Sequence, residues 1–165
     1  MKYDNIAKIE LISTNKAVIM NNKSCFFIGH ASTSDEILPA LRSAIETEIV
    51  SKGINEFYVG YHGRFDALAT RALREAKQRH PQIRCYLVTA YHPGVTKLEI
   101  PPEFDGIYYP FDRSVPARYA LPKANRAMID QCTTLIAAVY SPGRSRDVLE
   151  YAQRKSIRIV NLSEK

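Results

Sequence analysis

The sequence predicts an α/β protein with three layers, in which helices cover both faces of a mostly parallel sheet. From Cys25 onward, short apolar runs alternate with amphipathic helical patterns. This alternation is typical of parallel strands joined by helical crossovers. The runs CFFIG, CYLV and TLIAAV are almost wholly apolar, which indicates strands buried on both faces. The 165 residues contain no internal repeat or low-complexity linker, so one domain is expected.

The first half of this pattern contains two strand–helix units. CFFIGH, residues 25–30, is the first predicted strand, and a helix is expected over about 34–52. NEFYVGY, residues 55–61, is the second strand. The second helix begins near Arg64, carries an apolar stripe along one face, and ends before Pro81.

The second half continues the alternation. Strands are expected at 84–91 and 106–110, a helix at 117–132, a strand at 133–140, a helix at 145–155 and a closing strand at 157–162. Pro122 is expected to delay or kink the start of the helix that contains it. Residues 1–22 stand apart from residues 23–165, as an N-terminal extension or a small hairpin. The sequence leaves both alternatives open, together with an alternative start at Met20.

Composition excludes several protein classes. Charges interrupt every apolar segment, so no membrane-spanning run is expected, and the N-terminus lacks a signal-peptide layout. Cys25, Cys85 and Cys132 form no Cys-x-x-Cys pair and are expected to be buried free thiols, which favours the cytoplasm. The four histidines are scattered, so no metal site is expected. The net charge of +6 fits attraction to phosphates on a small ligand or a nucleic acid.

Three strand-to-helix junctions contain glycine, at 29–30, 60–63 and 141–145. In a parallel sheet these junctions meet at one edge, where ligands bind and where helix N-termini present free N–H groups to anions. Gly60 and Gly63 are expected to let the backbone approach a phosphate or ribose without a Cβ in the way. Neither a dinucleotide fingerprint nor a phosphate-binding P-loop motif is present, which argues against an ordinary dehydrogenase or NTPase.

Four segments in order carry a family resemblance: FFIGH, GYHGRFDALATRAL, NRAMIDQCTTLIAAV and GRSRDVLEYAQRKSIRIVNL. This order resembles the SLOG superfamily, which joins the DNA-processing Smf/DprA proteins and the Lonely Guy phosphoribohydrolases, and the closest likeness is to its bacterial YpsA-like branch. The resemblance covers roughly Cys25 to Leu162. It implies a Rossmann-like fold, a nucleotide-type ligand at the strand ends and self-association as a homodimer.

The resemblance also implies a set of site residues. Tyr61 stands where the family has a small residue, so it narrows the pocket or stacks on a base. Arg144 replaces a family glycine and binds phosphate through its side chain. His62 contacts a phosphate or shuttles a proton, as does His30. The expected ligand-binding residues are Gly29, His30, Gly60, Tyr61, His62, Gly63, Asp66, Asn125, Arg126, Asp130, Gly143, Arg144 and Ser145.

Three functions remain open at this point. The first is binding of a nucleotide or nucleotide-derived small molecule, for sensing or sequestering, with no cofactor and with the base near the Gly29–His30 turn. The alternative is a nucleoside-monophosphate phosphoribohydrolase of the Lonely Guy type. In that enzyme Glu150 reaches the ribose and Arg126 holds the phosphate. The third is a module that associates with single-stranded DNA, ranked last because the sequence has no tryptophan and no evident basic–aromatic stripe.

Overall fold

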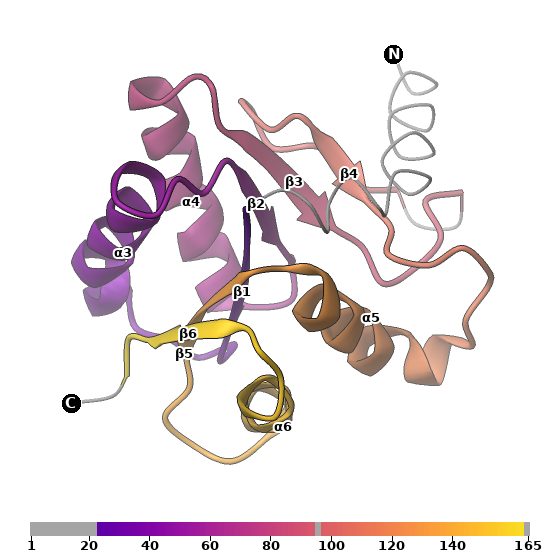
Figure 1. Cartoon of the computed structure of the whole chain (residues 1–165). Coiled ribbons are helices and arrows are strands. Elements are labelled where there is room, and N and C mark those ends of the chain that lie inside the picture. The colour runs from indigo at the N-terminus through magenta and orange to yellow at the C-terminus, as the bar shows by residue number, and fades with distance from the viewer. Residues whose placement is uncertain (1–22, 95–96, 164–165) are drawn as a thin grey trace.

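A six-stranded parallel sheet forms the centre of the computed structural model, which describes residues 23–94 and 97–163 (Figure 1). The strand order is β4-β3-β2-β1-β5-β6, and every neighbouring pair is parallel. The strands are β1 (Ser24–Gly29), β2 (Glu56–Val59), β3 (Arg84–Val88), β4 (Gly106–Tyr108), β5 (Thr134–Ala138) and β6 (Arg158–Asn161). The predicted α/β class with a parallel sheet is confirmed. The expected extension or hairpin at 1–22 lies outside the described residues.

Helices cover both faces of this sheet and complete the predicted three layers (Figure 1). Two of them, α3 and α4, pack on one face, and α5 and α6 pack on the other. Among the described residues the helices are the 3-10 turn η1 (Asp35–Ile37), α3 (Leu38–Val50), α4 (Arg64–Arg79), α5 (Ala117–Gln131) and α6 (Arg144–Gln153). None of them is long and apolar enough to cross a membrane.

The apolar runs of the sequence are buried because both faces of the sheet are covered. Successive side chains of a strand point to opposite faces. Phe27 and Phe57 therefore belong to the core under α3 and α4, whereas Phe26 and Tyr58 belong to the core under α5 and α6. The three cysteines are free and buried, as expected.

Two helices contain a proline in their first half, and only α3 begins later than predicted. Ser34 caps the 3-10 turn η1 by accepting a hydrogen bond from the Glu36 N–H, and α3 begins only at Leu38, with Pro39 in its first turn. The expectation that Pro122 delays the start of its helix is wrong, because α5 begins at Ala117 and continues through the proline. Pro122 is the sixth residue of α5, so its missing N–H removes one i→i−4 hydrogen bond, that to the Arg118 carbonyl.

The topology reverses between β1 and β5. From β1 the chain moves outward through β2, β3 and β4, and then returns to the other side of β1 as β5 and β6. Gly29, at the end of β1, lies in register with Ala138, at the end of β5. The carboxyl ends of parallel strands at such a reversal are where ligands bind in open α/β sheets.

Candidate anion-binding site

A pocket of about 210 Å³ lies at the carboxyl edge of the sheet, and we call it the first cavity. A single water needs about 10–15 Å³, so a substantial part of a small ligand fits. Its walls come from the end of β1, the β2–α4 turn, α5 and the start of α6. The predicted site residues that line it are Gly29, His30, Gly60, His62, Gly63, Asp66, Asn125, Arg144 and Ser145.

Other predicted site residues lie elsewhere. Arg126 lies over the ring of Tyr151, 5.1 Å from its centroid. Asp130 accepts the Tyr151 hydroxyl at 2.9 and 3.0 Å and pairs with Lys155 at 3.4 Å. Glu150 is exposed on α6 and does not line the first cavity.

Two more predicted residues border the first cavity without lining it. Tyr61 lines an adjoining cavity on the other side of the β2–α4 turn. Gly143 is the N-cap of α6 and immediately precedes Arg144, which does line the first cavity.

The glycines at the carboxyl edge serve mainly the packing of the protein itself. A Cβ at Gly29 would lie 2.3–2.7 Å from the side chain of Phe65, and one at Gly63 would lie 2.6 Å from the Cα of Ala31. A Cβ at Gly60 would lie 2.9 Å from an Asp66 carboxylate oxygen. Protein atoms thus lie where a Cβ of Gly60 or Gly63 would be, which gives both glycines a packing role. The expected approach of a ligand to their backbone stays a prediction.

Gly143 is different because nothing lies near the place that a Cβ would take. Its φ is +133°, a conformation that favours glycine, and a Cβ there would meet no described atom within 4 Å. The backbone at the start of α6 is therefore open to an incoming group.

The loops around the topological reversal are tied to each other. His30 Nε2 accepts the backbone N–H groups of Tyr140 at 3.2 Å and Ser141 at 3.3 Å. Ser145 Oγ donates to the Gly29 carbonyl at 2.9 Å. Because Nε2 is an acceptor, the proton of the neutral His30 ring lies on Nδ1. The imidazole thus holds the β5–α6 loop against the end of β1.

Burial lowers the pKa of both histidines of the first cavity. For His30 the main cause is desolvation, followed by the charge of Arg146. For His62 it is desolvation, followed by the charge of Arg144. Both rings are therefore neutral at pH 7, and the positive charge of the cavity wall comes from Arg144.

Asp66 lies in the first turn of α4 and is half-buried. Its Oδ2 accepts the His62 backbone N–H at 2.8 Å. Desolvation raises the pKa of this carboxyl from 3.8 to about 6, and the bond from His62 opposes that rise. Asp66 therefore changes charge close to neutral pH inside the cavity.

The N-termini of two helices, α4 and α6, lie at the carboxyl edge of the sheet. Neither the N-cap of α4, Gly63, nor that of α6, Gly143, has a side chain that caps its helix. In α4 the Arg64 N–H is already bonded to the Ala31 carbonyl at 3.1 Å. In α6 the first intrahelical bond is made by Asp147, so the N–H groups of residues 144–146 lack intrahelical acceptors. The start of α6 therefore offers an anion more free N–H donors than the start of α4.

Some lining residues were not anticipated. Leu121 lies four residues before Asn125 on α5, and both line the first cavity. The i, i+4 spacing places them on one helix face, a signal present in the sequence. Ala31 also lines the cavity, where it packs against Gly63. Because the two residues are far apart in the sequence, no local sequence pattern indicates this contact.

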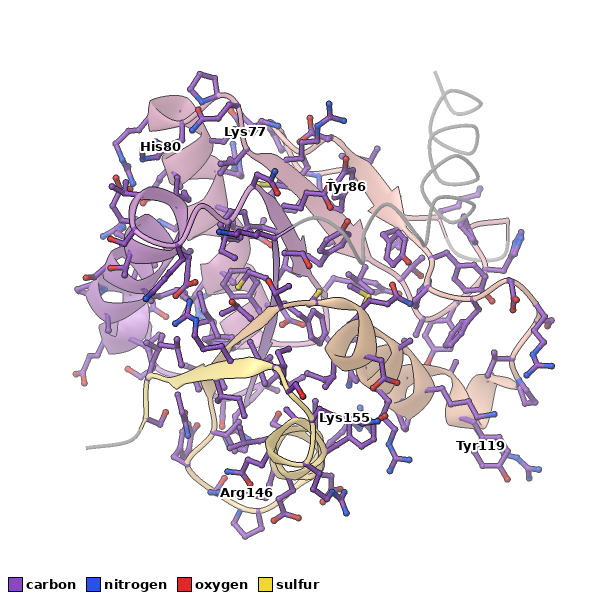
Figure 2. All side chains as sticks on the ribbon, viewed as in Figure 1. Lys77, His80, Tyr86, Tyr119, Arg146 and Lys155 are labelled. Atoms are coloured by element: carbon purple, nitrogen blue, oxygen red, sulfur yellow. The ribbon has the colours of Figure 1, made fainter. Side chains whose placement is uncertain are left out.

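A second feature, which we call the basic–tyrosine surface, comprises Arg118, Tyr119, Lys123, Arg126, Tyr151 and Lys155 on α5 and at the end of α6. Arg118 lies 4.6 Å and Lys123 5.8 Å from the Tyr119 ring centroid, and Lys155 lies 4.9 Å from that of Tyr151. Figure 2 shows Tyr119 and Lys155 on the α5–α6 side of the molecule, away from Lys77 on α4 and His80 just after that helix. The surface is assembled from two helices, which is why the sequence shows no continuous stripe.

The cations of the two helical layers differ in their partners. On α4, Arg64 pairs with Asp35, Arg74 with Glu103, and Arg79 with Glu46. Within residues 23–94 and 97–163, Arg118, Lys123, Arg126 and Arg144 take part in no ion pair. Among the cations of the described helices, the unpaired ones therefore lie on α5 and α6, and of these Arg144 lines the first cavity.

The described part of the chain contains no cluster of three residues able to hold a metal ion. In comparisons with known proteins, no family model matched this chain, and no curated protein matched it at a significant level.

Proposed function

We propose that this protein binds a nucleotide or a nucleotide-derived small molecule, with the phosphate at the start of α6. One observation carries the proposal: the uncapped N-terminus of α6 and Arg144 border the same pocket at the topological reversal of the sheet. A helix N-terminus supplies N–H donors, and an arginine adds a charge-assisted fork that suits phosphate. The SLOG resemblance of the segments around these residues supports a nucleotide as the molecule that carries this phosphate.

Binding for sensing or sequestering is proposed in preference to turnover. The hydrolase alternative assigns catalysis to Glu150 and phosphate binding to Arg126, and neither residue lines the first cavity. Asp66 and Arg144 are the charged groups there, and the Asp66 carboxylate already accepts a backbone N–H. The arrangement supports holding an anion.

A ligand panel tests the proposal. We expect AMP, ADP-ribose or a related nucleotide to raise the melting temperature through preferential binding to the folded state. Arg144→Gln should weaken that binding about 10- to 100-fold, because a hydrogen bond to a charged group contributes about 1.5–3 kcal/mol. Isothermal titration calorimetry gives the affinities.

Arg154→Gln is the matched control, since Arg154 is exposed at the opposite end of the same helix. It should leave affinity unchanged. The proposal would be contradicted if no nucleotide raised the melting temperature. It would also be contradicted if Arg144→Gln and Arg154→Gln lost nucleotide affinity to the same extent.

The basic–tyrosine surface favours one second candidate, association with single-stranded nucleic acid, as a lower-ranked partner. Exposed tyrosine offers a face for base stacking, and unpaired cations offer phosphate contacts. We expect the affinity for oligo-dT, measured by fluorescence anisotropy, to fall steeply between 50 and 200 mM salt. Replacing Arg118, Lys123 and Arg126 together by Gln should lower the salt slope by about two.

The control replaces Arg71, Arg74 and Arg79 on α4, which are already ion-paired. An unchanged slope in the α5 triple variant, or the same fall in the α4 triple variant, would rule this partner out.

A further inference from the structure

We propose that the cavity beside Tyr61, which we call the second cavity, is a subsite for the nucleobase of the same ligand, in place of the Gly29–His30 turn expected from the sequence. This rests on the proposed function, because it assumes that the phosphate is held at the start of α6. The second cavity has a volume of about 330 Å³. It shares Gly60, Gly63 and Asp66 with the first cavity, so the two lie on either side of one short turn.

The two cavities differ in charge. Arg144 and two histidines line the first, together with Asp66. The second has no lysine, arginine or histidine among its described lining residues, and its charged groups are the carboxylates of Asp66 and Glu99. A second phosphate is therefore disfavoured there. An uncharged group that carries N–H donors suits these acceptors.

The remaining wall of the second cavity suits a flat apolar group. Leu87, Leu98 and Pro101 supply aliphatic surface, and Tyr61 supplies an aromatic ring. Ligand sites typically combine such apolar walls with a few polar groups that fix orientation. An amino-bearing nucleobase has both properties: an aromatic plane for stacking and N–H donors at its edge.

Tyr61 gives a further indication. Its ring lies 4.2 Å from the His62 ring, and its hydroxyl is buried with no hydrogen-bond partner in the described structure. Buried polar groups are nearly always satisfied, so an unsatisfied one beside a cavity calls for an explanation. A polar edge of a bound base would supply the missing partner.

Asp66 fits the same ligand because it faces both cavities. A nucleotide joins phosphate to base through a sugar, so the sugar would cross the Gly60–Gly63 turn. The carboxylate is placed at that crossing and can accept a hydrogen bond from a sugar hydroxyl. The order phosphate, sugar, base then matches the order of Arg144, Asp66 and Tyr61.

Calorimetry on the full chain with AMP and ribose 5-phosphate tests this subsite. We expect AMP to bind about tenfold or more tightly than ribose 5-phosphate, the increment typical of one stacked base. Tyr61→Ala should remove that excess and leave the affinity for ribose 5-phosphate unchanged. Tyr61→Phe keeps the ring and should lose only the part contributed by the hydroxyl.

Leu98→Ala is the second variant, and it removes a different wall of the second cavity. It too should lower the affinity for AMP and not that for ribose 5-phosphate. Equal affinities of the wild type for the two compounds would overturn the base subsite while leaving phosphate binding intact. Parallel losses for both compounds in Tyr61→Ala and Leu98→Ala would also overturn it. If neither compound binds, the proposed function itself fails.

Discussion

Gly29→Ala is expected to lower the free energy of unfolding by about 3 kcal/mol, the upper part of the usual range for overpacking a core. The added Cβ would overlap the Phe65 side chain, with contacts of 2.3 to 2.7 Å. Phe65 is fully buried and packs between α4 and the sheet, so its ring has no free space to move into. For a chain of this size the melting temperature should fall by about 6–12 °C.

Urea denaturation followed by circular dichroism measures this change. Gly94→Ala is the control, because the nearest atom to its Cβ would be Nδ1 of the exposed His92 side chain at 3.1 Å. It should change stability by less than about 0.5 kcal/mol. A Gly29→Ala protein as stable as the wild type would show that the end of β1 does not pack against Phe65 in this way.

Asp66→Asn is expected to strengthen the binding of inorganic phosphate at pH 8 by about tenfold. The ionised carboxylate lies in the wall of the first cavity and repels an anion. Removing this unit charge should make the binding free energy more favourable by about 1–2 kcal/mol. Below pH 5 the wild-type carboxyl is mostly protonated, because its pKa is about 6. The two proteins should then bind phosphate alike, and titration calorimetry at both pH values measures the difference. A constant difference would contradict the assigned charge change.

The stability of the same two proteins should also depend differently on pH. Burial raises the pKa of Asp66 from 3.8 to about 6, so folding favours the protonated form. The wild type should lose up to about 3 kcal/mol of stability as pH rises from 4 to 7, and Asp66→Asn should lack this loss. The measurement is the free energy of unfolding of each variant across that range. Identical pH profiles would show that Asp66 titrates normally.

The fold was predictable because its signals are local. Runs such as TLIAAV must be strands buried on both faces, and the helical stripes between them require a layered sheet. Strand ends were less predictable. The expected strand 84–91 stops at Val88, because Thr89 Oγ1 accepts the Tyr91 N–H at 3.1 Å and turns the chain. Such side-chain bonds compete with the sheet in ways that periodicity does not show.

The position of the candidate site at the sheet edge was predictable from the sequence. The identity of each residue that lines it was harder to predict. The topology brings the three glycine junctions to one edge, as the rule for parallel sheets implies. The direction of side chains on α5 was harder to assign. Asn125 is buried in the wall of the first cavity, whereas Arg126 is exposed over Tyr151. Adjacent helix residues face directions about 100° apart, so the motif alone does not show which of the two enters the site.

The central claim is that an anion binds at the start of α6, and NMR chemical-shift mapping tests it most directly. A ¹⁵N-labelled sample is titrated with AMP while the backbone amide resonances are followed. We predict that the largest shifts arise at residues 143–146 and 62–66, with smaller ones at Asn125. Shifts confined to other parts of the molecule, such as the end of α4 at Lys77 to His80, would contradict the account.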